Sequence, residues 1–97
     1  MHFTGKFSAR CQGKYLVVLK RTSGQGEQSR LGVVVGKHVA PRAVTRTMMK
    51  RAIREAFRLL RAQLVPGDFV VRVRRKAIGS ELAALREELA TLLRESS

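Results

Sequence analysis

The order of hydrophobic and polar positions predicts a strand pair and a long helix in the first two thirds of the chain. Two short β-rich runs occupy residues 15–19 and 31–35, and the polar, glycine-bearing stretch between them predicts a hairpin of two antiparallel strands. Pro41 stands where a helix can begin, because the N–H group that proline lacks would be unpaired there. Apolar residues then recur with helical periodicity to about Leu64, where a Pro-Gly pair ends the pattern.

The remaining sequence predicts a third strand and a second helix. Residues 68–74 alternate in their second half, where two valines oppose Arg72 and Arg74, so one face of the sheet is expected to be basic. Ser80 can cap a last helix. This helix carries an apolar stripe made of Leu82, Leu85, Leu89, Leu92 and Leu93.

The order strand, strand, long helix, strand, helix predicts an α+β fold. We expect a two-layer sandwich in which helices cover one face of a small mixed sheet of about four strands, built as a single domain of residues 1–97. A short helical turn is expected around residues 3–7. By the general rule, the unit of residues 31–74 would cross over right-handed if its two strands are parallel.

The long helix has two chemically different faces. Residues 42–61 contain seven basic residues and one acid, Glu55. At about 100° per residue, the cations Lys50, Arg51, Arg54, Arg58 and Arg61 share one arc, with Arg46 at its edge. The opposite arc holds apolar residues that we expect to face a core, namely Met49, Ile53, Ala56, Leu60, Phe57 and Leu64. A solvated helix usually interleaves acids and bases, so this pattern favours a surface for a nucleic acid.

Charge and cysteine content narrow the class of protein further. The net charge is +13 and the isoelectric point about 11.6, which points to phosphate as the partner. Residues 79–97 contain two arginines and four glutamates, so the positive charge lies in residues 1–78. Cys11 is the only cysteine, which excludes an internal disulfide and fits a reducing compartment. Without a signal peptide or an apolar span, we expect a cytoplasmic protein that does not enter a membrane.

The sequence contains no recognisable catalytic constellation. Asp68 is the only aspartate, and beside Gly67 its expected role is local hydrogen bonding to a turn. His2 and His38 lack metal-ligand spacing with each other or with Cys11. We therefore expect no catalytic residue, no protein-held metal and no small-molecule cofactor.

Aromatic residues near the N-terminus suggest a second binding surface. Phe3 and Phe7 are four residues apart, a spacing that places both on one face of a helix, and Tyr15 opens the first predicted strand. Packing on the sheet would explain them equally well. The functional alternative is a surface on which unpaired bases stack. Positive charge for it would come from Lys6, Arg10, Lys14 and Lys20.

Residues 50–58, KRAIREAFR, resemble the basic helix of the protein component of bacterial ribonuclease P. The family pattern is Arg-Asn-Arg, one residue, Lys-Arg, two residues, Arg, often continuing Glu-x-Phe-Arg. Seven positions are in register with it: Arg46, Lys50, Arg51, Arg54, Glu55, Phe57 and Arg58. The resemblance extends to residues 35–44 and 68–77 and to the Phe3/Phe7 pair.

The sequence departs from the family pattern inside the helix. Thr47 and Met48 replace the Asn and the second Arg. Met48 lies on the wheel beside Val44, Ala52 and Leu59, so this flank is expected to pack and to narrow the RNA face. The stretch from Phe7 to Tyr15 also looks short for the family.

The resemblance implies a non-catalytic subunit of a ribozyme that removes the 5′ leader of precursor tRNA by endonucleolytic hydrolysis. The catalytic RNA and its Mg²⁺ ions would perform the chemistry, and the strand-helix-strand unit would cross over left-handed, against the general rule. Contacts to the catalytic RNA are expected from Arg46, Lys50, Arg51, Arg54, Arg42 and Arg58. The leader is expected to contact Phe3, Phe7, Tyr15, Lys14, Arg72 and Arg74.

Three other functions remain open from the residues alone. A small structural RNA-binding protein of ribosomal type would have the same charge and no substrate. A DNA-binding module would lay the basic helix in a major groove, although the chain before Pro41 offers strands rather than a partner helix. An autonomous nuclease lacks candidate catalytic residues.

Overall fold

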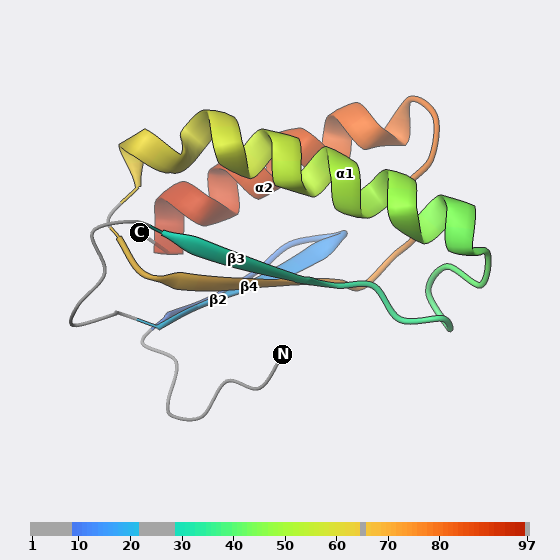
Figure 1. The fold of residues 1–97 in the computed structure, drawn as a ribbon, viewed down its shortest axis with the longest axis horizontal. Helices are drawn as coiled ribbons and strands as arrows, with labels where there is room; N and C mark the ends of the chain where they lie inside the picture. The colour runs from blue at the N-terminus through green and yellow to red at the C-terminus, as the bar shows by residue number, and fades with distance from the viewer. Residues whose placement is uncertain (1–8, 22–28, 65, 97) are drawn as a thin grey trace.

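The computed structural model describes residues 9–21, 29–64 and 66–96. They form a four-stranded sheet with two long helices on one of its faces (Figure 1). In chain order the elements are β1 (Ala9–Gln12), β2 (Leu16–Arg21), β3 (Arg30–Val34), α1 (Ala43–Leu60), the short 3-10 helix η1 (Arg61–Gln63), β4 (Asp68–Val73) and α2 (Glu81–Ser96). The predicted α+β sandwich is confirmed. The turn expected around residues 3–7 lies outside the described residues.

The strands are ordered β1-β2-β4-β3, with β1/β2 and β2/β4 antiparallel and β3/β4 parallel. The predicted hairpin between residues 15–19 and 31–35 is therefore wrong, because β4 lies between β2 and β3. The reason is the composition of β4, in which five of six residues are buried. Such a strand is most stable at the centre of a sheet, with a partner on each edge.

The hairpin that does form joins β1 to β2 and was missing from the sequence prediction. β1 contains only Ala, Arg, Cys and Gln, none of which belongs to the β-branched and aromatic residues enriched in strands. Its pairing with β2 runs from Ala9 opposite Lys20 to Gln12 opposite Val17. The strand is thus specified by its neighbour rather than by its own sequence.

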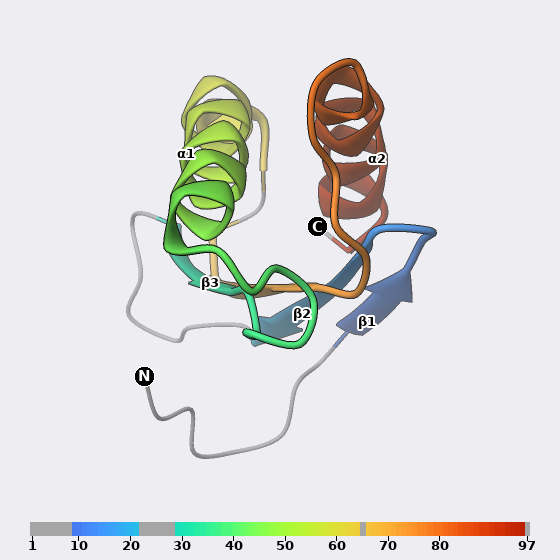
Figure 2. The same ribbon diagram turned by 90° about the vertical axis from the view of Figure 1, so that its right-hand side faces the viewer.

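The unit β3-α1-β4 crosses over left-handed. Its two strands run parallel and adjacent, and α1 lies over them on the helical side of the sheet (Figures 1 and 2). When α1 faces the viewer and both strands point upward, β4 lies to the left of β3. The general right-handed rule fails here, and the expectation from the family resemblance is confirmed.

The core lies between the sheet and the two helices, with α1 on the β3 side and α2 above β1 and β2 (Figure 2). Its largest fully buried side chains are Leu16, Val18, Met49, Ile53, Phe69, Val71, Leu85, Leu89 and Leu93. The rings of Phe57 and Phe69 meet edge to face, with centroids 5.8 Å apart. The apolar arc predicted for the long helix is therefore correct, with Ala56 and Leu60 half-buried at its margin.

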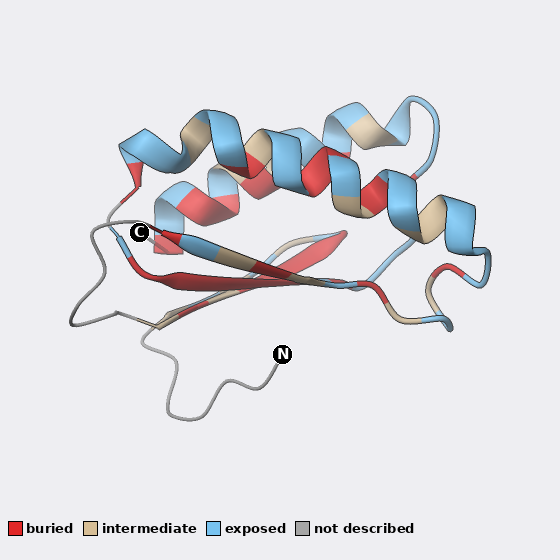
Figure 3. Cartoon of the chain, viewed as in Figure 1, coloured by how far each residue is buried: buried red, intermediate tan, exposed pale blue. Residues whose placement is uncertain are grey.

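The flank of α1 around Met48 does not pack. Ala52 is buried, but Val44, Met48 and Leu59 are 72%, 42% and 71% exposed. They lie about 120–180° around the helix from Ile53, which points into the core, so neither the sheet nor α2 covers them. The expectation that this flank packs is wrong. Figure 3 shows the exposed outer side of α1.

Among the described residues, no helix has the length and apolar character to cross a membrane.

Candidate nucleic-acid interface

The outer face of α1 presents the predicted cations to solvent. Burial of Met49, Ile53 and Phe57 against the sheet fixes the rotation of the helix. Arg51, Arg54 and Arg58 are consequently exposed, as is Arg42 at the N-cap, while Lys50 is partly exposed. Five of the six residues predicted to contact RNA are thus accessible to solvent along α1 or at its N-cap.

These cations lack acidic partners within the described chain. No ion pair to another described residue forms at Lys50, Arg51, Arg54 or Arg58. The first turn of α1 also contains no acid. Like charges three and four residues apart destabilise a helix by roughly 0.2–0.5 kcal/mol per pair. A polyanion bound along this face would relieve that repulsion.

Arg46 differs from the other predicted contacts because its guanidinium is already engaged. One nitrogen, Nη1, donates hydrogen bonds to the carbonyl oxygens of Ala40 and Pro41 at 2.8 and 2.9 Å. These hydrogen bonds from Arg46 hold the segment between β3 and α1 against the helix. The family pattern placed Arg46 on the basic face of the helix. In the structure its guanidinium instead contacts the backbone of Ala40 and Pro41.

The face of the sheet away from the helices carries a second group of cations. Register pairs place Arg10, Arg21, Arg30 and Arg72 on this helix-free face. Arg72 is exposed and lies between its cross-strand partners Val17 and Val34, as the predicted basic sheet face requires. Arg74 follows β4, and its guanidinium donates to the carbonyl oxygen of Gly13 at 2.7 Å.

Tyr15 and Lys20, expected beside unpaired bases, are buried among the helices and the sheet. Tyr15 is only 5% exposed, and its hydroxyl lies 3.4 Å from a carboxylate oxygen of Glu81 in α2. Lys20 is 4% exposed, with its ammonium 5.5 Å from the centre of the Phe69 ring. Tyr15 and Lys20 therefore pack against other side chains, whereas Lys14 in the same turn is exposed.

Glu88 is a residue that sequence reasoning missed. Its carboxylate accepts hydrogen bonds from the backbone N–H groups of Lys14, Tyr15 and Leu16 at 2.7–2.8 Å. A carboxylate from α2 thereby holds the β1–β2 turn in place. No sequence signal distinguishes Glu88 from the other acids of that amphipathic helix.

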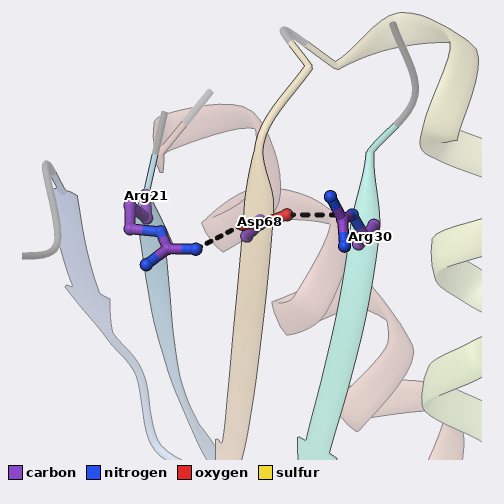
Figure 4. Close-up of polar contacts among 3 residues, drawn as sticks. All are labelled: Arg21, Arg30 and Asp68. Atoms are coloured by element: carbon purple, nitrogen blue, oxygen red, sulfur yellow. Dashed lines mark hydrogen bonds and ion pairs between the residues drawn. The ribbon is translucent and has the colours of Figure 1, made fainter. Parts of the chain in front are cut away.

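Asp68 is not the turn residue that its neighbourhood in the sequence suggested. It is the first residue of β4 and lies between two arginines of adjacent strands (Figure 4). Its carboxylate is 3.0 Å from Nη2 of Arg21 in β2 and 3.5 Å from Nε of Arg30 in β3. The buried aspartate joins three strands at the end of the sheet.

The aromatic pair Phe3 and Phe7 lies outside the described residues, so its predicted contact with the leader stays a prediction. The described leader candidates do not form one cluster. Arg72 lies on the helix-free face, whereas Lys14 and Arg74 lie at the β1–β2 turn.

The chain is a basic α+β sandwich with a left-handed β3-α1-β4 crossover. Its helix α1 carries exposed cations that form no ion pair with a described residue. The family model described as Ribonuclease P matches residues 2–97. The chain therefore belongs to the ribonuclease P protein family, as the basic helix suggested.

Relatives and solved structures agree with this family. The chain is 46% identical to the ribonuclease P protein component of Bordetella petrii over 65% of its own length and 51% of that protein. It is 49% identical to the component from Xylella fastidiosa over 67% of its length and 48% of the relative. The chain thus spans about half the length of the curated relatives that it matches.

The solved structures match over most of the fold. The RNase P protein of Thermotoga maritima, in complex with 1-(4-fluorophenyl)-2-thiourea, is 34% identical with a TM-score of 0.77, covering 89% of this chain and 83% of that one. The RNase P protein of Staphylococcus aureus is 26% identical with a TM-score of 0.81, covering 92% and 81%.

Proposed function

We propose that this protein is the protein subunit of ribonuclease P, which binds the catalytic RNA through α1 and assists removal of the 5′ leader from precursor tRNA. The observation that carries the proposal is the outer face of α1. Arg51, Arg54 and Arg58 are exposed there and form no ion pair with a described residue. This is the arrangement that phosphate groups neutralise.

The subunit contributes binding and positioning, and the RNA contributes the chemistry. Among the described residues, no three His, Cys, Asp or Glu side chains come together as a metal site. The one buried aspartate, Asp68, is engaged by Arg21 and Arg30, and this cationic surrounding opposes a metal ion. The described residues thus do not fit Mg²⁺, and we assign this ion to the RNA.

The leader is assigned to the helix-free face and the adjoining turn. Arg72 and Lys14 are exposed there and suit the backbone of a single strand. The helix and this face lie on different sides of the molecule, so the protein can hold catalytic RNA and substrate at the same time.

The experiment that tests the proposal is co-purification of the tagged protein from its own cells, followed by sequencing of the bound RNA. Enrichment of the catalytic RNA together with precursor tRNAs is expected. Enrichment of ribosomal RNA alone would instead establish a structural ribosomal protein. A charge-reduced variant, Arg54→Ala with Arg58→Ala, controls for nonspecific capture and should recover less of both RNAs.

A further inference from the structure

An apolar hollow lies within the cationic face of α1. Its lining is Ala43, Val44, Thr47, Met48 and Arg51, and its volume is about 290 Å³. Pockets for small ligands measure roughly 300–1,000 Å³, so the hollow has room for one small ring system. It lies at the two positions, Thr47 and Met48, where the sequence departs from the family pattern.

The side chains of the hollow suit a nucleotide. Val44 and Met48 supply an exposed apolar floor, and a thioether makes favourable contacts with aromatic rings. The Thr47 hydroxyl can donate to or accept from a base edge or a ribose 2′-hydroxyl. Arg51 adds a guanidinium that can stack on a base or pair with its phosphate.

The positive charge around the hollow favours a nucleotide over a second copy of the chain as the group that binds there. The net charge is +13, and α1 carries the exposed Arg54 and Arg58 one and two turns beyond the hollow. Two copies joined through this face would bring the exposed arginines of both helices together, and each helix has a single acid, Glu55, to offset them. An RNA strand supplies phosphate for the arginines and an apolar ring for the hollow.

We propose that the hollow of Val44, Thr47, Met48 and Arg51 holds one unpaired base of the catalytic RNA. The proposal rests on the proposed function, since it names how α1 grips its RNA partner. In this chain an apolar contact to a base replaces the polar contacts expected of the Asn-Arg pair.

The first test compares binding of variants to the catalytic RNA transcribed from the same genome, over a range of salt concentrations. Met48→Gln keeps length and helix propensity but loses the apolar contact, so the affinity should fall roughly tenfold, as for a lost stacking contact. The slope of log K against log salt should not change. Arg51→Gln should make the slope shallower by up to about 0.9. Leu59→Ala, an exposed apolar residue outside the hollow, is the matched control and should bind as the wild type does.

The second test observes Met48 directly in protein labelled with ¹³C at the methionine methyl groups. A base stacked on the thioether shifts the Met48 methyl resonance upfield when catalytic RNA is added. Met49, which is fully buried in the core, is the internal control.

The outcomes separate the two proposals. Failure of the wild type to bind catalytic RNA would overturn the proposed function. Normal binding by Met48→Gln together with an unmoved Met48 resonance would overturn the base site alone and leave a purely cationic contact. Self-association of the free protein that Met48→Gln abolishes would assign the hollow to a second copy instead.

Discussion

Replacing Glu88 with alanine removes the carboxylate that holds the turn between β1 and β2. Backbone N–H groups of Lys14, Tyr15 and Leu16 all donate to it, at 2.7–2.8 Å. Tyr15 and Leu16 are buried, so their N–H groups have no ready access to water, whereas Lys14 is exposed. The substitution therefore leaves two buried donors unpaired.

The structure sets the expected loss of stability. A hydrogen bond to a charged group contributes about 1.5–3 kcal/mol, and an unpaired buried donor costs about 1–3 kcal/mol. Water can replace the hydrogen bond at Lys14, and the loss of a hydrogen bond already includes part of the cost of the unpaired donor. We therefore expect Glu88→Ala to lower the free energy of unfolding by about 3 kcal/mol. For a domain of this size, that loss lowers the melting temperature by roughly 12–24 °C.

Gly13 permits a sharper test of the same contact. A Cβ atom at Gly13 would overlap the carboxyl group of Glu88, so Gly13→Ala must push the carboxylate out of the turn. Gly13 is not among the residues with positive φ, so alanine fits its backbone. We expect Gly13→Ala to cost about 2 kcal/mol in the wild type and less than about 0.5 kcal/mol when Glu88 is already alanine.

The assay is urea denaturation of the wild type, both single variants and the double variant. Glu87→Ala, an exposed acid next in the same helix, controls for the change in charge. Additive effects of the two substitutions, or an effect of Glu88→Ala no larger than that of Glu87→Ala, would refute the reasoning.

The ion pairs of Asp68 and the arginines of the basic helix can be tested by single substitutions. Asp68→Asn breaks the ion pair with Arg21, which would cost about 3–5 kcal/mol if both partners were fully buried. Because the Arg21 side chain is 34% exposed, we expect the free energy of unfolding in urea to fall by about 2 kcal/mol. Arg30→Ala should change it by less than about 0.5 kcal/mol, since Arg30 is 79% exposed; equal losses would contradict the assignment. Arg46→Ala should cost about 1 kcal/mol in the same assay, through its bonds to the carbonyls of the lead-in segment; an unchanged midpoint would refute that role. Arg54→Ala should leave stability unchanged and make the salt dependence of RNA affinity shallower by about 0.9; an unaltered slope would remove Arg54 from the RNA contacts.

The sequence predicted the elements whose own periodicity specifies them. Residues Met49, Ile53 and Phe57 repeat at helical spacing, and the structure buries all three. β4 was equally clear, because Phe69, Val70 and Val71 form an apolar run and Val73 then alternates with Arg72. Element type follows from such local patterns.

Sheet order and the contacts between distant segments were beyond local patterns. The chain between β2 and β3 resembles a hairpin loop, yet β4 inserts between the two strands after an intervening helix. The Glu88 carboxylate meets a turn more than 70 residues earlier in the chain. Asp68 likewise finds its arginines only when three strands align. These contacts depend on tertiary arrangement, which spacing in one sequence does not encode.

The candidate site likewise has features that local sequence patterns predicted and features that depend on the tertiary arrangement. The exposed cations of α1 followed from the helical wheel, because the buried arc fixes the opposite arc. The hydrogen bonds of Arg46 depend on the position of the segment between β3 and α1. The exposure of Met48 depends on where α2 lies. The hollow beside Met48 was therefore visible only in the structure.

We propose that this protein helps the catalytic RNA hold the leader of precursor tRNA. The most direct measurement is the affinity of the catalytic RNA for precursor tRNA at low Mg²⁺, with and without the protein, using one substrate with its leader and one without. We predict that the protein raises affinity for the substrate with a leader and leaves the other unchanged. An equal increase for both substrates, or none for either, would contradict the account.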